Sequence, residues 1–227
     1  MATGLQRIVP LTALLMLALT TSACDTPSPA PPVKSSESSA PSWSPDASTG
    51  SGADASGAIV GPAPSDLHDV DWTKVPAPGA FCGVPKLVRF DAQGQAAARS
   101  TAWGTVRIMR GRTVLYGDTD GDHRDEAAVY LGCDDTGATQ NGQIAAAYAV
   151  YGHVGKNLGV IGTITPRKKS ATYLTALVGA DFSTGRIVAH EKWYRPNDAH
   201  CCPTGDATTV WYRHGDGLTP GATRLTS

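Results

Sequence analysis

Residues 113–133 read TVLYGDTDGDHRDEAAVYLGC, in which an acidic loop separates two short apolar segments. The segments cover residues 113–116 and 127–133 and contain Thr, Val, Leu and Tyr, a composition typical of strands. At the two-residue period of a strand, one face of the second segment carries Ala127, Val129, Leu131 and Cys133. The stretch therefore predicts two β-strands joined by the loop, with Cys133 on an apolar face.

Most of the chain after residue 65 has the same character. Short segments with β-branched or aromatic residues are separated by turn residues, such as those at 91–94 and 215–217. These segments cover residues 86–90, 105–109, 185–194 and 208–214, with weaker patterns at 158–164 and 173–178. Residues 143–151 are ambiguous, because their alanines favour a helix whereas their isoleucine, valine and tyrosines suit a buried strand. We expect a strand there.

Together these segments predict a mainly β domain, either an antiparallel sandwich or a curved sheet, supported by disulfides. We expect a short helical turn over residues 66–72 at the start of this domain. No period of about 20–50 residues repeats, which argues against a solenoid or a complete propeller. The formal net charge is −1, and no basic cluster occurs beyond Arg167, Lys168 and Lys169, so nucleic-acid binding is disfavoured.

The first 23 residues have the layout of an export signal. Arg7 is the one basic residue of its amino-terminal part, residues 8–19 are largely apolar, and small residues follow up to Ala23. The apolar run is interrupted by Pro10 and is shorter than the about 20 residues that a transmembrane helix needs. We therefore expect residues 1–23 to be a signal peptide that is removed.

The residues Ser22, Ala23 and Cys24 resemble the end of a lipobox, the cleavage site of bacterial lipoproteins. The resemblance implies that Cys24 becomes the lipidated first residue, with acyl chains such as palmitate that hold the protein on a membrane. Thr21 stands where the family usually has a leucine-like residue, so plain secretion after Ala23 is the alternative. The expected location is the outer face of the cytoplasmic membrane, in the cell envelope.

Residues 24–65 have a different composition from the rest. Eight of the 16 prolines of the chain lie here among Ser, Ala, Gly and Thr, with few large apolar residues to bury. We expect a disordered Pro/Ser/Gly-rich tether that follows the lipidated cysteine. The expected organisation is therefore a signal peptide at 1–23, a tether at 24–65 and a β-rich extracytoplasmic domain at 66–227.

The chain has 5 cysteines, and using Cys24 for the lipid leaves an even set suited to disulfides outside the cell. That set is Cys82, Cys133, Cys201 and Cys202. Three pairings are possible, and the sequence does not choose among them. Because neighbours in an extended segment point to opposite faces, we expect the two adjacent cysteines to bridge different partners rather than each other. A bond between them is the alternative, and it would be a candidate redox switch.

The acidic loop carries the spacing of a cation site. Carboxylates at its first, third, fifth and ninth positions, with a backbone carbonyl at the seventh, can converge on one hard cation. The expected ligands are Asp118, Asp120, Asp122, the carbonyl of Arg124, and Glu126. The alternative is an acidic, solvated hairpin turn without a metal.

This loop resembles the Asp-rich loops of bacterial cell-surface calcium repeats and of integrin-type propeller blades. The resemblance implies one bound Ca²⁺ with a structural role. Two features depart from those families. His123 stands at the sixth position, where glycine is usual, and the loop occurs once rather than many times.

Four aromatic residues cluster late in the chain, as the pairs Trp193–Tyr194 and Trp211–Tyr212. On neighbouring strands each pair places one ring on each face, so Trp193 and Trp211 are candidate contacts for a glycan or protein partner. The competing interpretation is that these rings cover a small core.

The organisation as a whole resembles secreted lipoproteins of high-GC Gram-positive bacteria that have no settled activity. We expect a monomeric, non-catalytic binding domain whose partners are the membrane, through the lipid, and an envelope protein or glycan. The alternative is an envelope enzyme or enzyme inhibitor that uses the His200-Cys201-Cys202 region, with histidine activating a thiolate.

Overall fold

The computed structural model describes residues 55–136, 142–170 and 173–226. The expected signal peptide, Cys24 and most of the expected tether lie outside these residues. The described part is a mainly β domain with antiparallel sheets, which confirms the expected fold class. None of its helices is long and apolar enough to cross a membrane.

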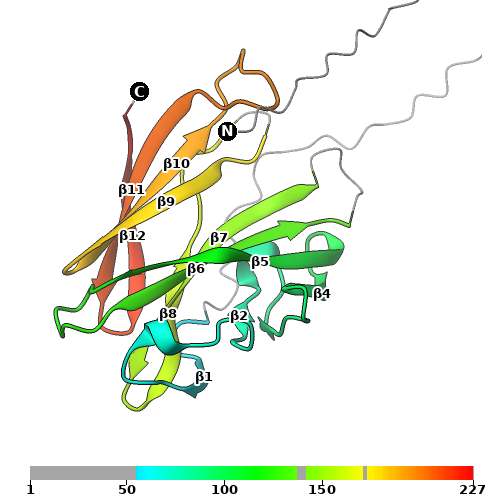
Figure 1. Ribbon diagram of the computed structural model, residues 1–227. Helices are drawn as coiled ribbons and strands as arrows, with labels where there is room; N and C mark the ends of the chain where they lie inside the picture. Colours follow the sequence, from blue (N-terminus) through cyan, green and yellow to red (C-terminus); the bar gives the residue numbers. More distant parts are fainter. Residues whose placement is uncertain (1–54, 137–141, 171–172, 227) are drawn as a thin grey trace, which may run out of the picture. The chain divides into compact units, whose positions relative to one another are not determined.

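The larger sheet has six strands, and every neighbouring pair is antiparallel. In spatial order they are β1 (Ile59–Pro62), β8 (Asn157–Ile164), β7 (Gln143–Val154), β6 (Glu126–Asp134), β5 (Gly104–Gly117) and β4 (Gln95–Ser100). The smaller sheet has four antiparallel strands, which Figure 1 shows in yellow to red. They are β12 (Gly217–Leu225), β11 (Gly205–His214), β10 (Arg186–Trp193) and β9 (Ala176–Ser183).

Short elements cover the outer face of the larger sheet. They are the 3₁₀ turns η1 (Leu67–Asp69) and η2 (Ala80–Cys82), and the paired strands β2 (Ala77–Pro78) and β3 (Leu87–Val88). The η1 turn confirms the helical turn expected over residues 66–72, and the Asp66 carboxylate caps it by accepting from the His68 amide.

Most expected strands are confirmed, among them the one expected over the ambiguous segment 143–151, which is β7, and two differ. Residues 105–109 and 113–116 belong to one strand, β5, whose register shifts between Arg110 and Val114. The segment expected at 173–178 joins the sheet only from Ala176, because the ring of Tyr173 packs against another aromatic ring instead.

The chain joins the larger sheet before residue 66, where the β-rich domain was expected to begin. It does so at β1, whose residues pair with β8. Ile59 and Val60 are among the few apolar residues of this Pro-rich region. Val60 packs against the core, and backbone pairing with β8 adds to that contact.

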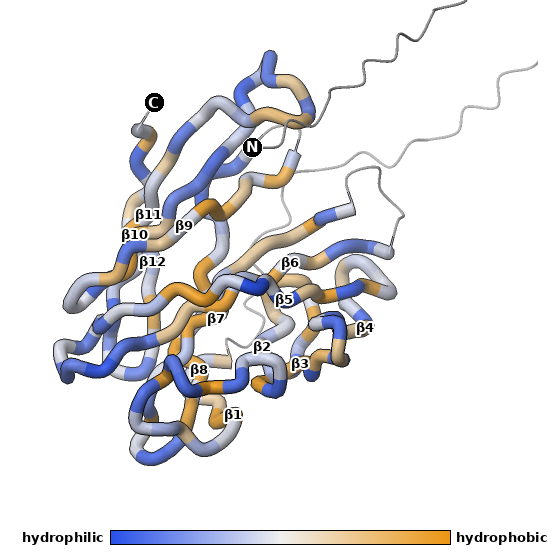
Figure 2. Tube along the Cα trace, viewed as in Figure 1, coloured by the Kyte–Doolittle hydropathy of each residue, from blue (hydrophilic) through white to orange (hydrophobic). Residues whose placement is uncertain are grey.

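Strand β6 divides the apolar side chains between two cores. Its residues Ala127, Val129, Leu131 and Cys133 all belong to the first core, as the alternation predicts. This core lies under residues 67–88, which we call the covering segment. Ala128 faces the second core, which also contains Ile187 and Trp211 of the smaller sheet. The strands that share these cores with β6, such as β7 and β8, are correspondingly apolar along much of their length (Figure 2). A strand buried on both faces therefore joins the two sheets.

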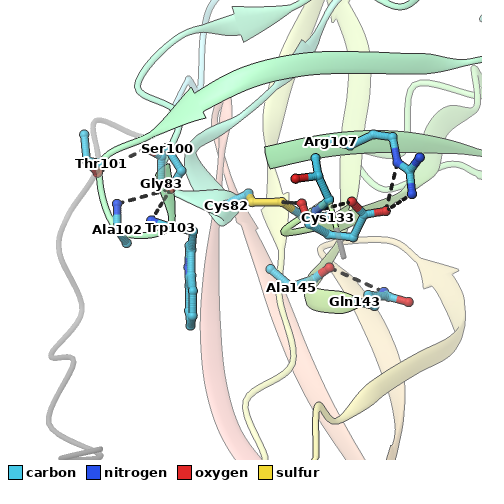
Figure 3. Close-up of a disulfide and its surroundings, with 12 residues drawn as sticks. Cys82, Gly83, Ser100, Thr101, Ala102, Trp103, Arg107, Cys133, Gln143 and Ala145 are labelled. Atoms are coloured by element: carbon cyan, nitrogen blue, oxygen red, sulfur yellow. Dashed lines mark hydrogen bonds and ion pairs between the residues drawn. A yellow bond between two sulfur atoms is a disulfide. The ribbon is translucent and has the colours of Figure 1, made fainter. Parts of the chain in front are cut away.

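A disulfide fastens the covering segment to this central strand. Cys82 of η2 is bonded to Cys133 of β6, and the two residues are 1% and 0% exposed (Figure 3). Beside it, Asp134 accepts two hydrogen bonds from the Arg107 guanidinium, at 2.6 and 2.9 Å. The bond closes a loop of 51 residues, so it restricts the unfolded chain substantially.

Replacing Cys82 and Cys133 together by Ala is expected to lower the free energy of unfolding by about 2–5 kcal/mol, because the cross-link then no longer limits the unfolded ensemble. Urea denaturation measures the change. The matched control replaces Cys201 and Cys202 by Ser, which is expected to cost less than about 1 kcal/mol since that bond spans adjacent residues. Equal costs for the two double variants would contradict this assignment.

Candidate functional sites

The acidic loop between β5 and β6 folds around the carboxylate of Asp118. Its Oδ1 accepts from the Gly121 amide at 2.6 Å, and its Oδ2 accepts from the His123 amide at 3.0 Å. Both donors have left-handed backbones, with φ of 81° at Gly121 and 64° at His123. The sixth position therefore adopts the conformation that glycine favours although histidine occupies it.

Three of the expected ligands converge. Carboxylate oxygens of Asp118, Asp120 and Glu126 lie within 4.8 Å of one another, an arrangement that can hold a metal ion. Asp122 differs from the expectation, because its Oδ2 accepts from Nε and Nη2 of Arg124 at 2.8 and 2.5 Å. These hydrogen bonds lower the pKa of Asp122. The fifth position of the loop therefore neutralises Arg124 and lies outside the carboxylate group.

Glu126 is the buried member of the group, with 3% of its surface exposed. Its Oε2 accepts from the Thr119 amide at 2.6 Å and from the Thr119 hydroxyl. Burial nevertheless raises the pKa of Glu126, because desolvation of the charged form outweighs these hydrogen bonds. A cation beside Glu126 would offset that cost.

Arg213, which no sequence motif indicated, faces the same carboxylates from β11. Its side chain is only 7% exposed, and its guanidinium nitrogens lie 3.6 Å from Glu126 Oε1 and 3.5 Å from Asp120 Oδ2. Its Nε donates to the Gly215 carbonyl at 2.6 Å, which fixes the side chain within its own hairpin. Arg213 stands 93 residues from Asp120 in the chain, so no local motif could reveal it.

Three hairpin turns meet at this point and line an open surface pocket of about 410 Å³. Its lining consists of Thr119, Asp120, Thr184, Gly185, Arg213, Gly215 and Asp216. The Gly185 amide donates to the Thr119 carbonyl at 2.7 Å and the Arg213 amide to the Gly185 carbonyl at 2.9 Å, which connects the three turns. The three clustered carboxylates and one guanidinium carry −3 and +1, so the group has a net charge of −2.

A second pocket, of about 210 Å³, lies where the other end of the β9–β10 hairpin meets the larger sheet. We call it the aromatic cleft, and it is lined by Tyr130, Gln143, Tyr173, Leu174, Ala176, Tyr194 and His200. The Tyr173 ring packs edge-on against two others, with its centroid 4.8 Å from that of Tyr194 and 4.5 Å from that of His200. Across the cleft, Gln143 Nε2 donates to the Tyr130 hydroxyl at 2.8 Å.

The loop that carries His200 contains the second disulfide. Cys201 is bonded to Cys202, so the expectation that adjacent cysteines bridge different partners is wrong. The reason is that Cys82 and Cys133 face each other in the first core, whereas residues 201 and 202 lie in an exposed turn outside the strands. With both sulfurs bonded, neither is a thiolate that His200 could activate, and the cysteine-based enzyme alternative has no nucleophile in this form.

The two candidate partner-binding tryptophans do not form an exposed surface. Trp211 is 5% exposed and belongs to the second core, which bears out the competing interpretation for this residue. Trp193 is half-buried, and Lys168 Nζ lies 4.3 Å from the centroid of its ring. The neighbouring residue Tyr194 lines the aromatic cleft, and Tyr212, the neighbour of Trp211, is 45% exposed.

In comparisons with known proteins, no family model, no curated protein and no solved structure matched the chain.

Arg213→Met is expected to lower the free energy of unfolding by about 3 kcal/mol at pH 7 in chelator, because it leaves buried Glu126 without the guanidinium that faces it. Glu126 binds its proton more tightly in the folded than in the unfolded protein, so stability falls as pH rises from 4.5 through the raised pKa. Below that window Glu126 is neutral, and the cost of the substitution should shrink.

Urea denaturation across the pH range measures this cost. Arg124→Met serves as the control, because its partner Asp122 is solvent-exposed enough that the pair contributes under about 1 kcal/mol. A cost of Arg213→Met that stays constant through acid pH would show that Arg213 does not compensate the charge of Glu126.

Proposed function

We propose that the chain is a non-catalytic binding domain, held in the cell envelope by a lipid on Cys24, whose aromatic cleft takes a neutral sugar residue of a glycan. The aromatic cleft is the observation that carries this proposal. Calcium bound at the Asp118–Asp120–Glu126 group stabilises the opposite end of the β9–β10 hairpin.

The lining of the aromatic cleft favours a neutral ligand. Of the described residues that line it, none is Asp, Glu, Lys or Arg, so an ionic ligand would lose its hydration without a charged partner. The rings of Tyr130, Tyr173 and Tyr194 offer electron-rich faces, and the C–H groups on one side of a sugar ring pack against such faces. The side-chain carbonyl oxygen of Gln143 and the tyrosine hydroxyl oxygens can accept hydrogen bonds from the sugar hydroxyls.

The size of the aromatic cleft favours a single ring. Its volume of about 210 Å³ is below the range of about 300–1,000 Å³ that drug-sized ligands occupy. A longer glycan would therefore place one residue in the cleft and extend into solvent. Such binding depends on few contacts, so a Kd of about 0.1–1 mM is expected.

Calorimetric titration with two neutral trisaccharides, of β-1,4-linked N-acetylglucosamine and of β-1,4-linked glucose, tests the sugar proposal. At least one should bind. Tyr173→Ala should weaken its binding about tenfold, because Tyr173 is the ring that packs against both Tyr194 and His200 in the aromatic cleft. The control is Tyr212→Ala, which removes an exposed tyrosine outside the aromatic cleft and should leave the Kd unchanged. If neither trisaccharide binds, or both variants behave alike, the sugar proposal is wrong.

The donor set of the carboxylate group supports calcium. All side-chain donors are oxygens, which favours a hard cation over a transition metal. The net charge of −2 that remains beside Arg213 is neutralised by one divalent ion. The Arg124 carbonyl, expected from the loop spacing, would complete the protein ligands. Weak, millimolar affinity is typical of extracellular calcium modules.

Adding calcium at about ten times its Kd is expected to raise the melting temperature by about 3–6 °C, since the ion binds the folded protein alone. Asp120→Asn should abolish the gain. Asp122→Asn is the matched control, because Asp122 pairs with Arg124 outside the group, and it should keep the gain. Identical melting curves with calcium and with chelator would refute the calcium site.

The cysteine inventory supports lipidation. The four other cysteines pair among themselves, so none is left in this chain to form a disulfide with Cys24. Mass spectrometry of protein purified from a native membrane should find an acylated Cys24 at the amino terminus, and Cys24→Ser should release the domain into the medium. An unacylated terminus at Cys24 would favour plain secretion instead.

A further inference from the structure

We propose that the Cys201–Cys202 disulfide is a thiol-exchange site for a dithiol reductant, and that its reduction loosens the His200 wall of the aromatic cleft. The effect on a bound sugar rests on the function proposed above. The effect on the wall does not.

Accessibility distinguishes this disulfide from the other one. Cys201 and Cys202 are both exposed, whereas Cys82 and Cys133 are 1% and 0% exposed. Exchange begins when a thiolate reaches a sulfur and attacks it, so access decides which disulfide reacts. In the folded protein a dithiol therefore reaches the 201–202 bond first.

The fold does not depend on this bond. A link between adjacent residues closes almost no chain, so it removes little entropy from the unfolded state. The base of the loop is held independently by Asp198, whose Oδ2 accepts from the Arg195 and Thr204 amides at 2.7 and 2.8 Å. The hydrogen bond from Thr204 lowers the pKa of Asp198 and keeps the carboxylate charged. Reduction therefore leaves the base of the loop in place.

The tip of the loop is different, because the bond restricts the residues that present His200. His200 precedes Cys201, its ring lies 4.5 Å from that of Tyr173, and its carbonyl accepts from the Tyr194 hydroxyl at 2.8 Å. The disulfide closes a small covalent ring over the 201–202 peptide, and opening it frees backbone rotations next to His200. Reduction thus acts directly on one wall of the aromatic cleft.

The exchange needs only the protein disulfide and one dithiol molecule. One thiolate of the reductant attacks a sulfur of the 201–202 bond, forms a mixed disulfide and releases the other cysteine as a thiolate. The second thiol of the reductant, as its thiolate, then attacks the mixed disulfide and displaces the remaining cysteine. The reductant leaves as an oxidised, cyclic disulfide. Two electrons and two protons pass to Cys201 and Cys202.

To test this, the folded protein is treated with increasing dithiothreitol and alkylated, and the modified cysteines are located by mass spectrometry. Cys201 and Cys202 should be alkylated together at reductant concentrations that leave Cys82 and Cys133 bonded. Nuclear magnetic resonance should show the His200 and Tyr173 ring signals shifting with the same dependence on reductant. The double variant Cys201→Ser/Cys202→Ser should show the shifted signals from the start and should not respond to dithiothreitol.

Three outcomes would overturn the proposal: simultaneous reduction of both disulfides, no reduction of the 201–202 bond in folded protein, or ring signals that do not move on reduction. The affinity for the bound trisaccharide should fall about tenfold in the reduced form. An unchanged affinity would overturn the effect on the ligand. If the ring signals move but neither form binds a trisaccharide, the sugar proposal fails while the exchange site stands.

Discussion

The buried carboxylate of Glu126 is the constraint on which one end of the domain depends. It begins the central strand β6, and it contacts Thr119 in the acidic loop and Arg213 in the smaller sheet. A charge taken out of water needs compensation, and here it comes from two separate hairpins, through Thr119 and Arg213. The interaction that satisfies one side chain therefore also brings the two sheets together at this end. A cation at the same carboxylates would act on the same contact.

The β9–β10 hairpin connects this end to the aromatic cleft. Its turn, through Thr184 and Gly185, lines the pocket that contains Arg213 and Asp120. Its open end lines the aromatic cleft through Ala176 and Tyr194. The first site fixes the hairpin by charge and hydrogen bonds, whereas the second leaves rings and a short exposed loop to face a ligand. This division suits the two proposed roles, which are a structural calcium ion at the first site and sugar binding at the second.

Local patterns predicted the parts of the fold that depend on neighbours in sequence. The alternation in β6, the acidic loop between two strands and the turn at η1 all follow from residue spacing. Contacts between residues distant in the chain could not be predicted. The main cases are Arg213 and the pairing of β8 with β1, which lies within the Pro-rich region. Asp122 was misassigned because spacing could not show that Arg124 engages it. The disulfide pairing depends on which sulfurs the two cores and the exposed turn bring together, which no spacing encodes.

The proposed calcium site depends on Glu126 being a buried carboxylate whose charge a cation compensates. Carbon-13 resonance of its carboxyl group, followed against pH with chelator and with calcium, tests it most directly. Without calcium the pKa of Glu126 should lie above 4.5, because burial disfavours the charged form. With calcium it should fall below that value, since the ion favours the carboxylate. A pKa at the ordinary value in both conditions would contradict the account.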